Sequence, residues 1–304
     1  MKLFPSTISA KKIKIERFQH VREKYYRSIV IVILMVTGCL AVWGKDGLSF
    51  KVEVRQYGEG IESRDTNTVT WWQNRWMDDS ADGAVIFDLQ NSRLYLLDRR
   101  NQLWTGGELQ PTLDEMQRAT VNLAKKVRQN YGISRKDRID DDKNPFAEQV
   151  KLVFVNQEKV DGKLCRHYRI MYRDELKEEI WIATEYMPGN YLDLKRFLPA
   201  LERYSRIMDI FSRELTKGDK YLLESAIQDK LMTLFTSGLE LRSREYTNGK
   251  LLYEKVVTDI KSWKGSAEQF APPSGYKKIP YSQYLENGIP TVREIFDPDN
   301  LERH

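Results

Sequence analysis

Most extended segments of this chain are separated by only two or three turn-forming residues. Residues 239–246 and 251–263, for example, both have strand-like composition and are joined through Asn248-Gly249, two residues that tolerate positive φ. Connections this short join neighbouring antiparallel strands, whereas parallel strands need a crossover of a dozen or more residues. The spacing therefore excludes a doubly wound parallel sheet.

Two other parts of the chain have a helical period. Apolar residues recur at helical spacing between residues 112 and 131 and again between residues 191 and 235. The predicted strands occupy residues 48–55, 69–76, 84–89, 93–98, 102–104, 150–154, 164–172, 179–182, 239–246 and 251–263. The order predicts an α+β fold, in which a curved antiparallel sheet forms an incomplete barrel with helices packed on its concave face.

The first 44 residues have the pattern of an export signal. Seven Lys and Arg residues between positions 11 and 27 precede an apolar stretch at residues 29–43. This stretch is shorter than the roughly 20 apolar residues of a spanning helix. We therefore expect residues 1–44 to be a signal peptide or an N-terminal membrane anchor, and the protein to be exported, either periplasmic or anchored facing the periplasm.

Cys39 adds a third possibility for this leader. Val36-Thr37-Gly38-Cys39 resembles a bacterial lipobox, in which the cysteine is acylated and becomes the new N-terminus, although an apolar rather than polar segment follows it. After the leader, we expect one domain over residues 45–284 with a helical insertion at 190–238, followed by a polar tail at 285–304.

The basic charge of the chain belongs to the leader. Residues 1–44 hold eight of the 49 Lys and Arg and two of the 44 Asp and Glu, which leaves 41 basic and 42 acidic residues in the remainder. The remainder is thus close to neutral, and basicity gives no reason to expect nucleic-acid binding.

Few residues after the leader could support catalysis. Cys165 is the only cysteine there, and His167 is the only histidine apart from the final residue. Two residues apart on a predicted strand, they would share a face and form a conceivable thiolate–imidazole pair, but no oxyanion-forming turn lies next to them. Asp88 and Asp98 bracket a hairpin and are more typical of turn-capping residues than of paired acids. We predict no metal, no cofactor and no enzymatic activity.

Aromatic residues are the stronger signal. Tryptophans lie in or near the predicted strands, and the helical stretch adds a stripe of large apolar side chains. Such residues build either a plain core or an apolar pocket. The candidate cavity-lining residues are Trp71, Trp104, Trp181, Phe197, Tyr204, Met208 and Phe211.

Three motifs resemble one family. They are residues 84–89 with the following hairpin through Trp104, residues 160–168 with 179–183, and the ending at 270–278 with its Pro-Pro-Ser-Gly-Tyr core. Together they resemble uncharacterised exported bacterial domains of the LolA-like superfamily, which is related to outer-membrane lipoprotein carrier and sorting proteins. The resemblance covers roughly residues 48–279, and the helical stretch at 191–235 departs from it.

The resemblance implies a half-barrel whose apolar interior is lidded by helices and holds lipid acyl chains. We therefore expect a non-catalytic envelope protein that binds a lipid or acylated ligand. Two alternatives stay open. One is a structural or protein-interaction module of the envelope with a filled interior, and the other is a hydrolase that uses Cys165.

Overall fold

The computed structural model describes residues 46–57, 63–131, 144–215 and 218–288. Cys39 and the rest of the leader lie outside the described residues, as does the part of the predicted tail from residue 289 onward.

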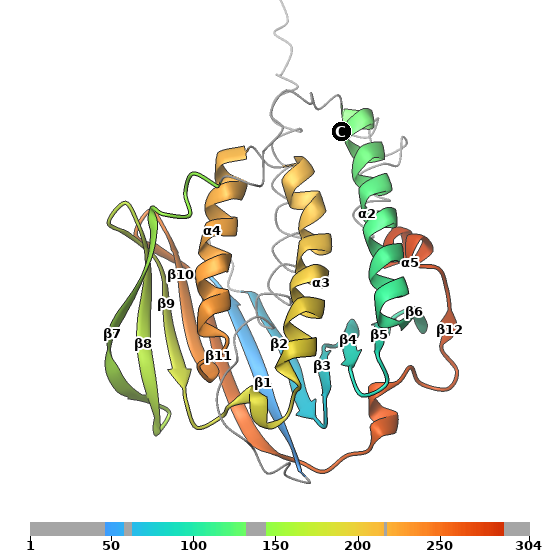
Figure 1. Ribbon diagram of the computed structural model, residues 1–304, viewed down its shortest axis with the longest axis horizontal. Helices are drawn as coiled ribbons and strands as arrows, with labels where there is room; N and C mark the ends of the chain where they lie inside the picture. The colour runs from blue at the N-terminus through green and yellow to red at the C-terminus, as the bar shows by residue number, and fades with distance from the viewer. Residues whose placement is uncertain (1–45, 58–62, 132–143, 216–217, 289–304) are drawn as a thin grey trace, which may run out of the picture.

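Within these ranges, one open sheet of twelve strands forms the body of the protein (Figure 1). Its order is β12-β6-β5-β4-β3-β2-β1-β11-β10-β9-β8-β7, so the first strand lies in the interior of the sheet. The strands are β1 (Gly47–Gln56), β2 (Ser63–Trp72), β3 (Arg75–Asp79), β4 (Gly83–Asp88), β5 (Arg93–Asp98), β6 (Leu103–Glu108), β7 (Val150–Val160), β8 (Lys163–Tyr172), β9 (Glu175–Ala183), β10 (Leu239–Thr247), β11 (Lys250–Trp263) and β12 (Lys277–Lys278).

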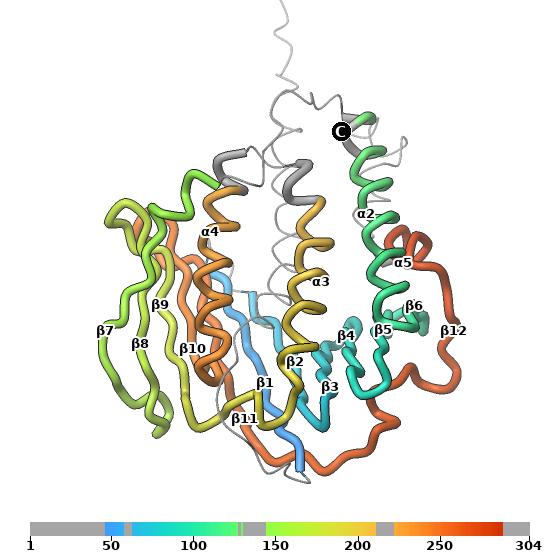
Figure 2. Tube along the Cα trace, viewed as in Figure 1, coloured from blue at the N-terminus to red at the C-terminus, as the bar shows by residue number. Residues whose placement is uncertain are grey.

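Three long helices lie side by side in front of this sheet, as Figures 1 and 2 show. They are α2 (Leu109–Tyr131), α3 (Leu194–Leu215) and α4 (Gly218–Leu234). The short helix α5 (Tyr281–Gly288) packs beside α2, and two 3₁₀ turns, η2 (Pro188–Asn190) and η3 (Ala267–Phe270), complete the elements. The predicted class of a curved α+β sheet with helices on one face is confirmed.

Local turn chemistry accounts for the antiparallel order. Asn248 and Gly249 have φ values of 51° and 71°, and Asp161 and Gly162 have 49° and 80°, as the turn between two twisted strands requires. The pairing between β12 and β6 is the parallel exception, and it involves two residues of β12.

The two faces of the sheet bury different side chains. We call the side covered by α3 the helix face, because Phe87 of β4 contacts Phe197 and Tyr204 of that helix. The opposite side is the outer face. A second, smaller core on the outer face is centred on Phe270 of η3, and its other buried members are Ala84, Ile86, Tyr95 and Leu97.

Two elements differ from the sequence-based expectation. Helix α2 begins at Leu109 rather than residue 112, so Pro111 lies in its first turn, where a missing N–H costs nothing. Residues 277–288 contain two elements that were not expected, β12 inside the predicted domain and α5 at its end; Tyr281 of α5 is 1% exposed and donates its backbone N–H to Glu115 of α2 at 2.8 Å. Helix α5 thus crosses the domain boundary expected at residue 284.

Gly106 of β6 provides a test of the strand packing. A Cβ at this position would lie 2.1 Å from the carbonyl oxygen of Leu94, and φ is +121°. We expect Gly106→Ala to lower the free energy of unfolding by about 3 kcal/mol. Gly249→Ala is the matched control, because its φ is also positive but no atom lies within 4 Å, so it should lose about 1 kcal/mol. Equal losses in urea unfolding of the two variants would contradict the close approach.

Candidate functional site

An aromatic cluster joins the sheet to α3 on the helix face. The ring centroids of Trp76 and Phe87 are 5.7 Å apart, and that of Phe197 lies 5.8 Å from Phe87 and 6.1 Å from Trp76. Tyr204, two helical turns further along α3, contacts Phe87 at 5.6 Å. Of the predicted cavity-lining residues, Phe197 and Tyr204 are therefore brought together here, in the layer between sheet and helix.

Trp71 belongs to the same face. It is cross-strand partner to Leu48 and Trp76, and its ring lies 4.9 Å from that of Phe50. Its indole Nε1 is buried and has no hydrogen-bond partner in the part of the chain that the structure describes. Met208 of α3 packs partly buried against this core. The side chain of Phe211 lies outside the described residues.

Buried polar groups cross the middle of the helix face. Asp78 of β3 pairs with Val69 and accepts a hydrogen bond from the Asn67 side chain, while its Oδ1 has no partner. Lys255 of β11 forms an ion pair with Glu240 of β10, and the side chains are 10% and 4% exposed. A buried lysine and two buried carboxyl groups therefore lie among the apolar side chains of this face.

Asp78 is strongly affected by its surroundings. Burial raises the pKa of its carboxyl group to about 7, the nearby Asp79 adds to the rise, and Asn67 and Lys255 oppose it. Because Lys255 is already paired with Glu240, it compensates the charge of Asp78 only in part. Ser205 of α3 and Gln228 of α4 also carry buried oxygens without partners. The layer between sheet and helices thus combines aromatic surface with unsatisfied polar atoms.

Trp104 and Trp181 lie on the outer face, away from α3. Trp104 is cross-strand partner to Leu97, its ring lies 5.7 Å from Tyr95, and Lys278 Nζ is 4.9 Å from the ring centroid. Trp181 faces the side opposite Ile180 on β9, where its ring stacks on His167 at 4.4 Å. The structure does not bring these two tryptophans together with Trp71.

The Trp181 side chain is held on several sides. Its Nε1 donates a hydrogen bond to Glu158 Oε1, and the Arg244 guanidinium lies 5.6 Å from the ring centroid. His167 is 3.4 Å from Glu158 and 3.5 Å from Glu179. Burial lowers the pKa of His167, and the two glutamates oppose this shift. The imidazole is thus packed and flanked by acids.

Cys165 does not have the surroundings of a nucleophile. Its side chain is fully buried, and its Sγ donates to the backbone oxygen of Lys163 at 3.5 Å. Burial raises the pKa of the thiol, which disfavours the reactive thiolate. Asp88 and Asp98 are turn-capping residues, as expected, because each accepts hydrogen bonds from the backbone and side-chain nitrogens of the asparagine three residues later.

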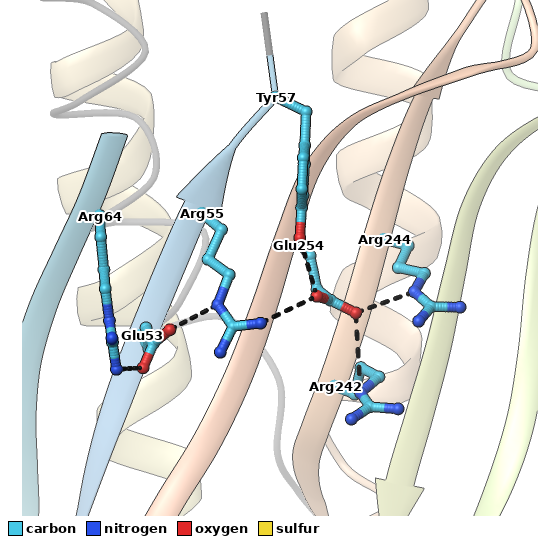
Figure 3. Close-up of polar contacts among 7 residues, drawn as sticks. All are labelled: Glu53, Arg55, Tyr57, Arg64, Arg242, Arg244 and Glu254. Carbon is cyan, nitrogen blue, oxygen red and sulfur yellow. Dashed lines mark hydrogen bonds and ion pairs between the residues drawn. The ribbon is translucent and has the colours of Figure 1, made fainter. Parts of the chain in front are cut away.

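A network of charged side chains crosses the outer face and was not predicted (Figure 3). Its centre is Glu254 of β11, which lies 2.9 Å from Arg244 Nε and 3.6 Å from Arg55 Nη1, and accepts a hydrogen bond from Tyr57 at 3.1 Å. Glu53 of β1 is paired with Arg55 and with Arg64 of β2. We call this set the outer-face charge network; its members are Glu53, Arg55, Tyr57, Arg64, Arg242, Arg244 and Glu254.

The carboxylates of this network are stabilised in their charged form. Burial opposes ionisation of Glu254, but hydrogen bonds from Arg244 and Tyr57 lower its pKa below the usual value. The pKa of Glu53 is lowered in the same way by Arg55 and Arg64. Glu53 and Arg55 share a face of β1 through their spacing, but only the cross-strand register adds the residues of β10 and β11, so no signal for the network as a whole is present in the sequence.

The residues that the structure describes contain neither a metal-binding cluster nor a membrane-spanning helix. No group of three or more His, Cys, Asp or Glu side chains there could hold a metal ion. Within the same ranges, every helix is too short or too polar to cross a bilayer.

Comparison with known proteins finds similarity at the level of three-dimensional structure. No family model and no curated protein sequence matches this chain. An uncharacterised protein from Thermus thermophilus aligns over 84% of this chain and 97% of its own, with 7% identity and a TM-score of 0.37. MucB of Pseudomonas aeruginosa, solved with MucA, aligns over 83% of this chain and 61% of its own, with 11% identity and a TM-score of 0.33.

The LolA-like resemblance identified from the sequence recurs among these structures. A LolA superfamily protein from Nitrosomonas europaea aligns over 83% of this chain and 98% of its own, with 8% identity and a TM-score of 0.24. The class of molecule is an open, curved antiparallel sheet with helices on one face.

Asp78 gives a pH prediction for stability. Its folded pKa is raised above the unfolded value, so ionisation costs the folded state free energy that increases from about pH 4 to pH 7 and is constant above. We expect Asp78→Asn to stabilise the protein at pH 8 by on the order of 3 kcal/mol and to have little effect at pH 4. Thermal unfolding at the two pH values measures this.

The matched control for this prediction is Asp79→Asn, the neighbouring residue on the opposite face of β3. Asp79 repels Asp78 but is also paired with Arg99 at 2.5 Å, so the loss of this ion pair should offset the relief of the repulsion and leave no net gain at pH 8. If Asp79→Asn stabilised the protein as much as Asp78→Asn, a general charge effect would replace the burial of Asp78 as the explanation.

Glu254 should show the opposite pH dependence. Its folded pKa is lowered, so its stabilising contribution is present above the unfolded value of about 4.5 and is lost as the pH falls through the folded value. We expect Glu254→Gln to cost about 2 kcal/mol at pH 7 and to make stability less sensitive to acid. Glu268 is exposed, so Glu268→Gln is the control. It should change neither the free energy of unfolding at pH 7 nor its dependence on pH, both measured by chemical unfolding from pH 3 to pH 7.

Proposed function

We propose that this chain is a non-catalytic, exported cell-envelope protein that binds a lipid or acyl chain between the helix face of its sheet and helices α3 and α4. The observation that carries the proposal is the make-up of this layer. Trp71, Phe197 and Tyr204 supply apolar surface, and Met208 is an adaptable side chain at its margin.

Polar atoms in the same layer favour an amphiphilic ligand. Among the described residues, Trp71 Nε1 is a buried donor without a partner, and Asp78 Oδ1 is a buried acceptor without one. Such atoms cost free energy unless another group supplies a hydrogen bond. A ligand with an acyl chain and a polar group would satisfy both kinds of surface. Trp104 and Trp181 are not part of this proposed site, because they lie on the outer face.

The export signal supports the cellular part of the proposal. The basic and apolar pattern of residues 1–44 is typical of an exported protein, and cleavage, retention as an anchor or acylation at Cys39 would each keep the domain in the envelope. The burial of Cys165 argues against the hydrolase alternative.

The opposite placement of two tryptophans allows a direct test with the full chain. An acyl chain brominated along its length should quench tryptophan fluorescence on binding. We expect Trp71→Phe to reduce this quenching and to weaken binding severalfold, because Trp71 contacts the proposed ligand. Trp104→Phe is the control and should leave both unchanged.

Extraction of lipid from the purified protein completes the experiment. We expect mass spectrometry to find an acylated compound in an amount comparable to that of the protein. If the protein contains no lipid and the brominated chain quenches nothing, the proposal is wrong. That result would favour the alternative of an interaction module with a filled interior.

A further inference from the structure

Strand β7 forms one edge of the sheet and carries exposed apolar side chains. In the sheet that the described residues form, it is hydrogen-bonded to β8 alone. Val153, Phe154 and Val155 are 42%, 53% and 38% exposed, and Leu164 of the adjacent β8 is 54% exposed. These four are the exposed large hydrophobic residues of the described ranges, and all lie at this edge.

A long apolar edge strand is a template for another strand, because its outward backbone N–H and C=O groups have no ladder partner. The opposite edge of the sheet is β12, which is two residues long, whereas β7 has eleven residues. Short edge strands are a recognised protection against edge pairing. Strand β7 is too long to be protected in this way.

A β-bulge places two opposite charges on the same face of this strand. Val153 is opposite Arg169 of β8, and after the register shift between Phe154 and Asn156, Asn156 is opposite His167. In a regular strand, residues seven apart point to opposite faces. Because of the bulge, Lys151 and Glu158 both lie on the outer face, one on each side of the apolar run.

We propose that β7 pairs antiparallel with β7 of a second copy of this chain, joining two sheets across a two-fold axis beside Phe154 and Val155. In this register Lys151 is opposite Glu158 of the partner subunit, and Val153 is opposite Asn156 of the partner subunit. Because of the two-fold symmetry, each of these two pairs occurs twice in the interface.

The charges of β7 make a second copy the best-fitting partner. An isologous interface has to be self-complementary, and one strand here carries both members of an ion pair at equal distances from its centre. Lys151 is exposed. In the described ranges the contacts of Glu158, to Trp181 and His167, use Oε1, so Oε2 can accept from a lysine.

The interface consists mainly of one strand pair, so it is smaller than the roughly 1,600 Å² of a standard stable complex. We therefore expect a dimer that dissociates on dilution, which sedimentation equilibrium of the full chain would show as a mass that rises with concentration.

Charge reversal tests the register. Lys151→Glu and Glu158→Lys should each place like charges opposite one another at both ends of the interface and weaken the dimer roughly tenfold. The double variant restores opposite charges and should recover the dimer. Lys159→Glu is the matched control, since Lys159 is opposite Leu164 on the helix face and has no charged counterpart in this register.

Recovery in the double variant, with an unchanged dimer in Lys159→Glu, would support the proposal. It is overturned if the wild-type chain stays monomeric at every concentration, as it would if the edge served a different protein. It is also overturned if the double variant stays as weak as the single ones while circular dichroism shows all four variants folded.

Discussion

The contact of α3 with β3 and β4 is the interaction on which the two-layer structure depends. Phe197 is fully buried between Trp76 and Phe87, and aromatic pairs of this kind stabilise beyond the area they bury. A sheet needs a second layer over its apolar face. By holding the helix against the sheet, this contact also removes the polar groups further along the helix face from water.

The two faces of the sheet therefore have opposite effects on acidic side chains. On the helix face, Asp78 is buried with incomplete compensation, and its pKa rises to about 7. On the outer face, Glu254 is also largely buried, but arginine and tyrosine donors surround it and its pKa falls. Burial alone does not determine whether the pKa of a carboxyl group rises or falls. The number of hydrogen-bond donors around the carboxylate determines it. The helix face thus has the capacity to accept further hydrogen bonds, and the outer face has little.

The sequence predicted those parts of the fold that depend on near neighbours. The hairpin at Asn248-Gly249 follows from the positive φ of two residues, and the helix ending at Tyr131 follows from its apolar period. Strand β12 could not be predicted, because two residues carry no alternation and their partner in β6 is more than 170 residues earlier in the chain.

The candidate site was predicted only in part, for a related reason. Trp71 and Phe197 were both chosen as large aromatic residues, and the structure places both in the same buried core. Trp104 was chosen on the same grounds but lies on the outer face. The register of β5 and β6 places it opposite Leu97 and so determines the face on which its side chain lies. The outer-face charge network was missed because its two halves, on β1–β2 and on β10–β11, meet only through the pairing of β1 with β11; Tyr57 and Glu254, for example, are 197 residues apart.

The interior position of β1 has a consequence for how this protein acquires its structure. One side of β1 pairs with β2, which follows it directly, but the other side pairs with β11, so that Gly47 is opposite Trp263. During synthesis the first half of the sheet can form early as a local meander. The seam along β1 stays open until nearly the whole domain has been made, and closure over such a sequence distance is intrinsically slow. The central seam of the finished sheet is thus among the last junctions to form, together with the pairing of β12 with β6, and until then β1 is an additional unpaired edge.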